Sequence, residues 1–487
     1  MPDRTPSGIE GLDTVLDGGF IAGGIIIVQG RPGTGKTILG NQMSFNHARA
    51  GGRVLYVTLL AESHGRMLMH LGSLAFFDPA AIPDQVYYIS GFPVLEAEGL
   101  HGLLTLLRRE VRAHSATMLI LDGLIAAEST AVSDLEFKKF IHELQIQATV
   151  ANCTMFLMTS AGDTDAEISA EHTMVDCVID MRSRLYGWRS ERDIEVLKRR
   201  GAGYLLGRHA IAISNAGIGV YPRFEMTQTR PLGIATPPGE RLSSGIPQLD
   251  AMFGGGIPQR SVTMLEGLTG VGKTTLGLHF LGSCSAAEPG LLFTVGHSPG
   301  TLLAKARTLG LPVAKLIEAG HVELVWQSTT AGLLDAALHH LTHSVRRVGA
   351  RRLCIDGLAG LLQLAPDRTR LPAVFAALVH ELRTLGVTSL FTSAVDDASS
   401  QLGSQPVPGT LHGTLSGIAD NIITMHLAER RSAMVRLISV FKGRDAPIDP
   451  RPRLYQITSN GITVGDAPND SGASPFGFAP GPTRHEA

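Results

Sequence analysis

Short apolar runs alternate with longer stretches of helical periodicity along the whole chain. Short apolar strands separated by helices are typical of a mostly parallel sheet covered on both faces. The expected buried strands are 25–29, 54–59, 118–121, 154–159, 262–265, 291–295, 353–356 and 389–392. The expected helices are 37–50, 100–114, 135–151, 274–286, 333–348 and 371–385. This pattern predicts the α/β class.

The alternation occurs twice. Residues 7–40 align without gaps on 244–277, and residues 213–218 align on 457–462. Each copy closes with alternating strands, for which we expect antiparallel pairing at a sheet edge. These strands are 194–198, 210–214, 434–441 and 454–458. A duplicated domain explains the repeat, and the predicted parts are a domain at 1–225, a linker at 226–241, a domain at 242–466 and a disordered tail at 467–487.

The pattern G-x-x-x-x-G-K-[ST] follows the first strand of each copy, at 30–37 and 267–274. Glycines let successive backbone N–H groups point at phosphate oxygens, and the lysine brings a positive charge to the β and γ phosphates. The helix that follows adds its positive end. We therefore expect ATP at both loops. The predicted binding residues are Gly33, Thr34, Gly35, Lys36, Thr37 and Ile38, and Gly270, Val271, Gly272, Lys273, Thr274 and Thr275.

An acidic residue ends a buried strand in each copy. Asp122 follows strand 118–121, and Asp356 ends strand 353–356. Such an aspartate holds Mg²⁺ together with the loop threonine, Thr37 or Thr274. The alternative role for each aspartate is a helix N-cap after the strand.

The two copies differ in the acid that would orient an attacking water. Glu62 lies just past strand 54–59, whereas the matching place in the second copy contains Gly296 and His297. We expect Glu62 and Lys36 to be catalytic and hydrolysis to occur mainly in the first domain. The alternative for Glu62 is an ordinary exposed acid at the start of a loop.

Lysine is scarce, with eight lysines among the 42 basic residues. Besides the two loop lysines, Lys198 and Lys442 stand at equivalent late strands, each with an arginine two positions on, Arg200 and Arg444. We predict that these four residues contact phosphate in a neighbouring subunit. The alternative is a basic edge strand that prevents aggregation.

Composition adds little about partners. The 487 residues carry a formal net charge of −2, so nothing global points to a nucleic acid or a membrane. No apolar run is long enough to span a bilayer, and no secretory signal is expected. The four widely spaced cysteines are interpreted as reduced core residues of a cytoplasmic protein.

These features resemble the KaiC family of double-domain ATPases from Ser7 to about Gly465. The resemblance rests on Ser-Gly-Ile-x-x-Leu-Asp before each loop, the loops themselves, Lys198–Gly201 and Lys442–Arg444, and the closing Gly-Ile pairs. It implies two tandem RecA-like P-loop NTPase domains. It also implies a homohexamer with ATP between subunits, and a signalling role with protein partners that the sequence does not name.

The resemblance also raises the question of a kinase. Family members that act as circadian oscillators phosphorylate an adjacent Ser-Thr pair of their own second domain. The matching segment keeps Ser416, with Thr414 nearby, but has Gly417 in place of the threonine. Ser416 and Thr414 are therefore the candidate acceptors for serine/threonine autokinase activity.

A different class of function stays open, a RecA-like recombination or repair ATPase acting on single-stranded DNA. Such a protein needs a basic loop that carries aromatic side chains. The better candidate is 182–189, where Tyr186 and Trp188 lie among three arginines, and 429–431 is the other. Stimulation of hydrolysis by single-stranded DNA would favour this class. A third possibility is a nucleotide-sensing scaffold without turnover.

Overall fold

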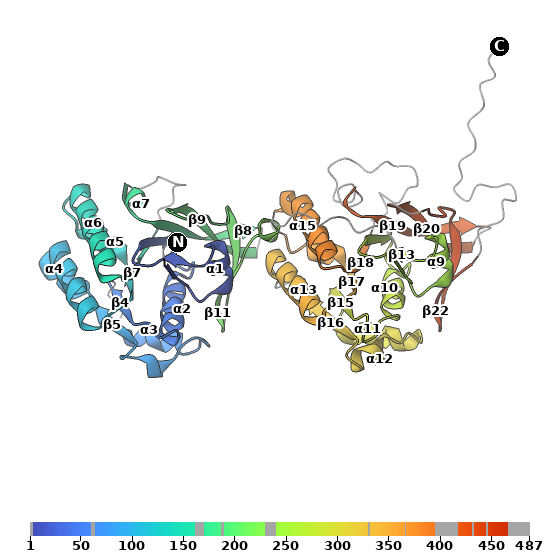
Figure 1. Ribbon diagram of the computed structural model, residues 1–487, viewed down its shortest axis with the longest axis horizontal. Helices are drawn as coiled ribbons and strands as arrows, with labels where there is room; N and C mark the ends of the chain where they lie inside the picture. Colours follow the sequence, from blue (N-terminus) through green and yellow to red (C-terminus); the bar gives the residue numbers. More distant parts are fainter. Residues whose placement is uncertain are drawn as a thin grey trace, which may run out of the picture. The chain divides into compact units, whose positions relative to one another are not determined.

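The computed structural model describes residues 3–59, 64–160, 170–186, 189–228, 240–329, 332–365, 367–394, 417–430, 433–444 and 447–465. The chain divides into two compact units, Met1–Thr227 and Gln228–Ala487. Figure 1 shows strands and helices alternating within each unit.

The first unit is built on a nine-stranded sheet in the order β11-β10-β9-β8-β3-β7-β6-β4-β5. From β8 to β5 neighbouring strands are parallel, and β9, β10 and β11 are added antiparallel. The strands are β3 (Ile25–Gly30), β4 (Val54–Thr58), β5 (Val86–Ser90), β6 (Met118–Asp122), β7 (Thr154–Thr159), β8 (Cys177–Tyr186), β9 (Arg189–Arg199), β10 (Arg208–Ser214) and β11 (Gly217–Tyr221), with a small separate pair, β1 (Arg4–Thr5) and β2 (Phe20–Ile21).

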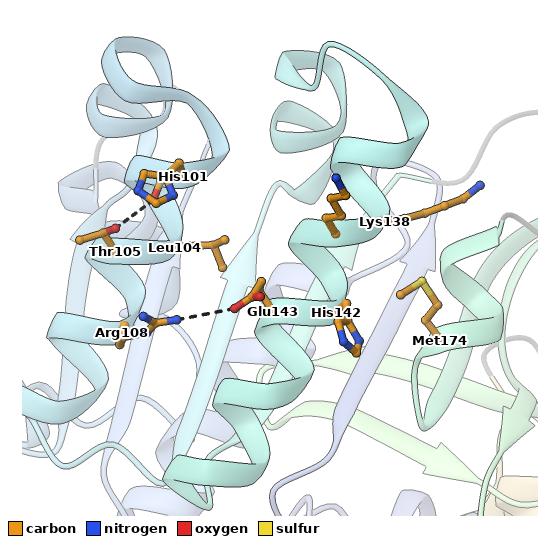
Figure 2. Close-up of a pocket in the computed structure, with 9 residues that line it drawn as sticks. His101, Leu104, Thr105, Arg108, Lys138, His142, Glu143 and Met174 are labelled. Carbon is orange, nitrogen blue, oxygen red and sulfur yellow. Dashed lines mark hydrogen bonds and ion pairs between the residues drawn. The ribbon is translucent and has the colours of Figure 1, made fainter.

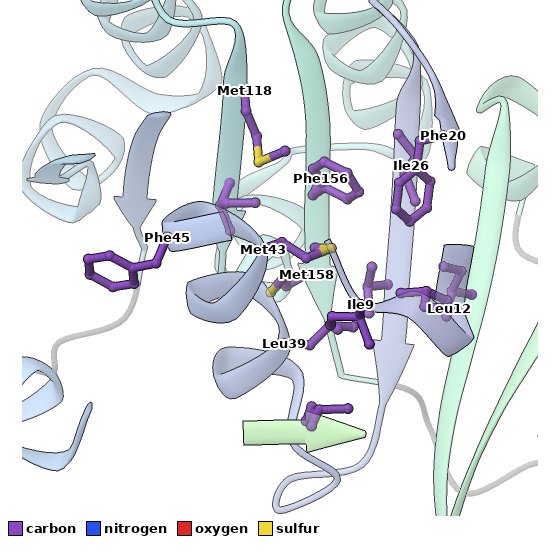
Figure 3. Close-up of a cluster of buried hydrophobic side chains, with 14 of the residues drawn as sticks. Ile9, Leu12, Phe20, Ile26, Leu39, Met43, Phe45, Met118, Phe156 and Met158 are labelled. Atoms are coloured by element: carbon purple, nitrogen blue, oxygen red, sulfur yellow. The ribbon is translucent and has the colours of Figure 1, made fainter. Parts of the chain in front are cut away.

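Helices cover both faces of this sheet, because its central strands present apolar side chains on each face in alternation. Ile26, Phe156 and Met158 pack with Leu39 and Met43 of α2 in one core (Figure 3). Their sequence neighbours pack under α4 and α6 in a second core. The helices are α1 (Glu10–Val15), α2 (Lys36–Arg49), α3 (His64–Leu71), η1 (Pro79–Ala81), α4 (Phe92–Ala113), α5 (Leu124–Thr130), α6 (Asp134–Ala151), α7 (Ala170–Met174) and α8 (Phe224–Thr227).

The second unit repeats this arrangement, with the strand order β16-β15-β17-β18-β14-β19-β20-β21-β22. Its strands are β14 (Val262–Gly267), β15 (Gly290–Val295), β16 (Val322–Gln327), β17 (Arg352–Asp356), β18 (Thr388–Ala394), β19 (Asn421–Arg430), β20 (Ala433–Gly443), β21 (Arg453–Thr458) and β22 (Gly461–Val464), with β12 (Arg241–Leu242) and β13 (Ile257–Pro258) as the small pair. Its helices are α9 (Pro247–Met252), α10 (Lys273–Leu281), α11 (Pro299–Thr308), α12 (Val313–Glu318), α13 (Leu334–Val348), α14 (Leu358–Leu362), η2 (Arg368–Arg370) and α15 (Leu371–Thr384).

The predicted α/β class, with mostly parallel sheets and antiparallel edge strands, is confirmed. Some boundaries were wrong: α4 begins at Phe92 instead of 100, with a break at Gly99, where φ is 66°, and α10 ends at Leu281 instead of 286. The sequence reading also missed β8 and β19, which pair in parallel with β3 and β14. None of the described helices combines the length and the apolar character needed to cross a membrane.

The predicted linker lies partly, and the predicted tail wholly, outside the described residues. Of the predicted linker, residues 226–227 form the end of α8 and Arg241 begins β12, while residues 229–239 lie outside the described residues. The four cysteines are all buried and form no disulfide, as expected for core residues.

Candidate nucleotide-binding sites

Each phosphate-loop pattern joins the central strand of a sheet to the helix that packs on it. In the first loop Gly33 and Gly35 have φ values of 82° and 107°, a region that favours glycine. A Cβ added to Gly35 would lie 2.8 Å from Cδ1 of Ile213, which belongs to β10. The second loop repeats this at Gly272, whose added Cβ would lie 2.6 Å from Cδ1 of Ile457. Backbone conformation therefore favours glycine at position 33, and both backbone conformation and packing require it at positions 35 and 272.

The helix start after each loop suits an anion. Glycine is the N-cap of both α2 and α10, no side chain caps their N-termini, and neither first turn contains an acid. Their first N–H groups therefore remain available for phosphate oxygens. Gly33 and Gly270 face open space.

The other predicted loop residues are more enclosed. Thr34, Val271 and Thr275 are almost fully buried. Ile38 packs partly against the core.

Each loop lysine lies over its own loop. Lys36 Nζ donates to the carbonyl oxygens of Gly30 and Arg31, at 2.6 and 3.1 Å. Lys273 Nζ donates to the equivalent oxygens of Gly267 and Leu268, both at 2.7 Å. Burial lowers the pKa of both ammonium groups, and the neighbouring aspartate carboxylates oppose that shift.

The predicted metal-binding pairs are brought together in both units. Thr37 Oγ1 donates to Asp122 Oδ2 at 3.1 Å, and Thr274 Oγ1 donates to the two Asp356 oxygens at 3.0 and 3.1 Å. Both aspartates are buried at the end of their strands. A hydroxyl and a carboxylate at this spacing form a hard oxygen donor set of the kind that Mg²⁺ prefers. The donor set therefore fits the ion.

A second hydroxyl donates to each of these carboxylates, and the sequence reading missed both. In the first unit the buried Tyr56 of β4 donates to Asp122 Oδ2 at 2.9 Å. In the second unit Thr392 of β18 donates to Asp356 Oδ1 at 2.8 Å and accepts the Gly357 N–H at 2.9 Å. For Tyr56 the available signal was a hydroxyl among the apolar residues of β4, whereas β18 contains four hydroxyl-bearing residues, so Thr392 did not stand out in the sequence.

The predicted catalytic Glu62 lies outside the described residues. Its described neighbour His64 begins α3, and Nε2 of this histidine hydrogen-bonds with Thr58 Oγ1 at 2.8 Å. Burial lowers the pKa of His64. In the second unit the exposed His297 places Nδ1 3.4 Å from Asp356 Oδ2. His297 therefore lies beside the carboxylate of the predicted metal pair.

The registers of β4 with β6 and of β15 with β17 show which residue of the second domain is equivalent to Glu62. Thr58 pairs with Asp122, and Thr294 pairs with Asp356, so these threonines correspond. Counting on from them matches Glu62 to Ser298, not to His297. Ser298 is the N-cap of α11, accepting the Thr301 N–H, so the second copy uses this position to start a helix.

The predicted neighbour-contacting residues bind their own unit. Lys198 Nζ donates to the carbonyl oxygens of His172, Thr173 and Val175 at 2.7, 2.9 and 2.9 Å, and Arg200 donates to Thr173 at 2.6 Å. These carbonyls lie at the C-terminal end of α7.

The equivalent pair in the second unit also bonds within it. Lys442 Nζ donates to the Ala419 carbonyl oxygen at 2.7 Å, and Arg444 pairs with Asp420 at 3.1 Å.

The remaining candidates are only partly visible. Ser416 and Thr414 lie outside the described residues, as does Trp188 of the basic aromatic segment. In the described part of that segment, Arg182 pairs with Asp180, and Arg189 pairs with Glu191 at 3.1 Å. Both arginines are thus matched with acids of their own hairpin.

Fold and site together define a P-loop nucleotide-binding protein with two similar α/β domains. A family model described as "ATPase: KaiC" matches residues 5–225 and 242–469. The chain belongs to this family. Its two units are accordingly RecA-like ATPase domains, and the predicted family and fold are confirmed.

Curated relatives match along nearly the whole chain. The circadian clock oscillator protein KaiC of a Picosynechococcus species is 27% identical over 479 residues, which cover 94% of this chain and 89% of the relative. KaiC of a Nostoc species is 26% identical over 94% of this chain and 88% of its own length. The circadian clock oscillator protein KaiC 1 of a Synechocystis species has the same identity and coverage.

Proposed function

We propose that the protein is a slow ATPase of KaiC type that binds ATP at both loops and hydrolyses it mainly in the first domain. The observation that carries the proposal is the hydroxyl–carboxylate pair beneath each loop, Thr37 with Asp122 and Thr274 with Asp356. This pair and the loop lysine are the groups that hold Mg²⁺ and the phosphates in a P-loop protein, and hydrolysis needs in addition a group that orients the attacking water.

Each residue of the first site has a role in this proposal. The N–H groups at the start of α2 and the Lys36 ammonium bind the phosphates. Thr37 and Asp122 hold Mg²⁺, which supplies charge neutralisation on the phosphate oxygens when it is bound. Tyr56 holds the Asp122 carboxylate in position through its hydroxyl. Glu62 orients the attacking water and polarises it.

The second domain keeps the lysine, threonine and aspartate but has Ser298 where the first has Glu62. Ser298 caps a helix, and a neutral hydroxyl polarises water far less than a carboxylate does. We therefore propose that the second domain retains nucleotide and turns it over slowly. His297 lies beside Asp356 and is the nearest candidate for a substitute base.

We propose further that ATP bridges subunits of a homohexamer. Lys198 and Arg200 would leave the α7 carbonyls to contact a phosphate bound by the neighbouring subunit, and Lys442 and Arg444 would do so in the second tier. Lys36→Ala should then weaken assembly more than Ser416→Ala. Sedimentation with and without ATP measures this, and a monomer under all conditions would contradict the ring.

The relatives' name, circadian clock oscillator protein, supports a regulatory role that acts through protein partners. Autophosphorylation at Ser416 or Thr414 would be one output of the second domain. Intact mass after incubation with ATP tests it directly. A mass increase of one phosphate that Ser416→Ala removes would identify the acceptor.

The decisive experiment for the hydrolysis proposal is Glu62→Gln, which removes the charge and keeps the shape. We expect loss of most phosphate release, with nucleotide binding unchanged. Glu96→Gln, at an exposed position of α4, is the matched control and should retain full activity. Unchanged turnover in Glu62→Gln would mean that another group activates water.

A further inference from the structure

A hollow of about 820 Å³ opens on the helical face of the first domain, away from the phosphate loop (Figure 2). Its walls are α4 and α6, and Met174 of α7 lies at one side. The polar residues that line it are His101, Thr105, Arg108, Lys138, Lys139, His142 and Glu143. The volume is typical of a small-molecule site.

The hollow is positively charged. Arg108, Lys138 and Lys139 carry permanent charges, and Glu143 is the only carboxylate among the described residues that line it. Arg108 and Glu143 are 3.7 Å apart and about half exposed, with 51% and 47% of their side chains accessible. Such a pair contributes little, so an incoming anion can take over the Arg108 guanidinium.

Lysine usage sharpens this observation. The chain has only eight lysines and otherwise uses arginine for positive charge. Two of the eight bind in the phosphate loops, and Lys138 and Lys139 are adjacent in this hollow. Solubility alone would be served equally well by arginine, so the pair is not explained by general surface charge.

The second domain provides an internal comparison. The inner faces of the corresponding helices match at buried positions, Leu107 with Leu341 and Phe140 with Val374. The positive charges of the hollow have no counterpart at the equivalent places of the second domain, and the place of His101 holds the buried Asp335, which pairs with Arg370 at 2.9 Å. In the order Arg108, Lys138, Lys139, His142 and Glu143, the residues at the same places are Thr342, Pro372, Ala373, Ala376 and Ala377. The fold therefore does not need the charged residues that line the hollow.

We propose that this hollow binds a small polyanion that carries at least two phosphate groups. Cations lie on both helical walls, which suits a compact anion held between them. Leu104 and Met174 add an apolar surface for the body of such a ligand. The site is separate from the ATP sites and belongs to the first domain alone.

The position of the hollow links it to the late-strand lysine. Met174 is the last residue of α7, and the carbonyl oxygens of the residues on either side of it, Thr173 and Val175, hold Lys198. A ligand that contacts Met174 would therefore contact the same short segment whose carbonyl oxygens bind Lys198.

The test is a calorimetric titration of the full chain with inorganic tripolyphosphate. Lys36→Ala and Lys273→Ala are present in every protein, so that the phosphate loops do not compete. We expect one site per chain, and Lys138→Ala with Lys139→Ala should weaken it by about tenfold or more. Lys305→Ala with Lys315→Ala is the matched control, because it removes the same charge from α11 and α12 and should leave binding unchanged.

Two further measurements decide the ligand class. ATP in the same titration separates a nucleotide from a plain polyphosphate, since a base that contributes contacts makes ATP bind more tightly. An acidic peptide that binds more tightly than either would overturn the proposal in favour of a protein partner. No binding of tripolyphosphate, or binding that the Lys138/Lys139 variant does not weaken, would also overturn it.

A measurement on the unmodified chain guards against folding defects in the variants. Tripolyphosphate should protect Lys138 and Lys139 from chemical acylation while Lys305 and Lys315 stay reactive. Equal reactivity with and without tripolyphosphate would contradict the site. Neither the titration nor the acylation measurement depends on hydrolysis. The proposal for the hollow and the ATPase proposal can therefore fail separately.

Discussion

In each domain the buried aspartate accepts hydrogen bonds from the loop threonine and from a second hydroxyl, but that second hydroxyl comes from a different strand in each domain. Asp122 accepts from Tyr56 on β4, whereas Asp356 accepts from Thr392 on β18. The positions are exchanged: Leu292 stands at the place of Tyr56, and Met158 at the place of Thr392. The hydrogen bonding of the buried carboxylate is kept, while the residue that supplies it is not.

Behind the first phosphate loop, by contrast, the hydrogen bonding is not kept. The first domain has a polar network there, and apolar residues stand at the equivalent positions of the second domain. Asn41 Nδ2 donates to the Thr37 carbonyl oxygen at 2.8 Å, and Tyr88 donates to Asn41 Oδ1 at 2.8 Å. The equivalent residues are Leu278 and Leu324. Buried polar groups that bond one another hold a unique geometry, so the first loop has support that the second lacks.

The largest effect that this comparison predicts concerns the loop lysines. Lys36→Ala should lower ATP hydrolysis by about a hundredfold or more, because a preorganised charge on the phosphates is lost. Lys273→Ala should change total hydrolysis little, because the second domain contributes little turnover. Steady-state phosphate release measures both.

The control for the Lys36→Ala and Lys273→Ala variants is the amount of nucleotide that each one binds. Each variant should lose bound nucleotide from its own domain, so that about half of the binding remains in either case. If Lys273→Ala lowered hydrolysis as much as Lys36→Ala, the assignment of turnover to the first domain would be wrong.

A smaller effect is expected from removing the exchanged hydroxyls. Thr392→Val should destabilise the second domain by about 1–3 kcal/mol, because Asp356 and the Gly357 N–H each lose a buried partner. Tyr56→Phe should destabilise the first domain less, because Asp122 alone loses a bond. Hydrogen exchange of β17 and β6 measures the two domains separately.

Thr154→Val is the control for the loss of a buried hydroxyl that does not touch the aspartate, because Thr154 Oγ1 lies 3.0 Å from Thr5 Oγ1 at the start of β7. It should leave Mg²⁺-dependent nucleotide affinity nearly unchanged, while Tyr56→Phe weakens it. Equal effects of the two substitutions would indicate that Tyr56 only fills space.

Many of the strands and helices and both phosphate loops could be predicted, because the sequence patterns that specify them span only a few neighbouring residues. The strand 154–159 was predicted with its observed ends, and the first two residues of each loop helix belong to the phosphate-loop pattern. The aspartate of the entry motif has a local reason too: Asp13 accepts the N–H groups of Ser7 and Gly8 at 2.8 and 3.1 Å. Patterns within a few residues carry such features.

What could not be predicted depends on residues far apart in the chain. The bond between Tyr56 and Asp122 spans 66 residues, and that between Thr392 and Asp356 spans 36. The strands β8 and β19 follow segments without a clear periodic signal. They are defined by their pairing, in parallel with the distant β3 and β14 on one side and antiparallel with β9 and β20 on the other. The match of Glu62 to Ser298 instead of His297 likewise needed the strand register.

The smallest predicted effect concerns a third exchange between the domains. Gln42 of α2 makes two hydrogen bonds with the Ile218 backbone, at 2.7 and 3.1 Å. At the same place in the second domain, His279 Nε2 accepts the Ile462 N–H at 2.7 Å. A protonated Nε2 cannot accept, so this contact requires the neutral ring.

The pH dependence of the second domain follows from this contact. Burial lowers the pKa of His279 below its ordinary value of 6.5, although a hydrogen bond with the Gly245 backbone opposes the shift. The unfolded chain therefore binds a proton more readily than the folded one, and stability falls as the pH drops below about 6.5. His279→Gln copies the first domain and should reduce this loss, by on the order of 1 kcal/mol for one hydrogen bond. Urea unfolding at pH 7.5 and 5.5 measures it, with His343→Gln on α13 as the control. An unchanged pH dependence in His279→Gln would show that the ring does not need to be neutral.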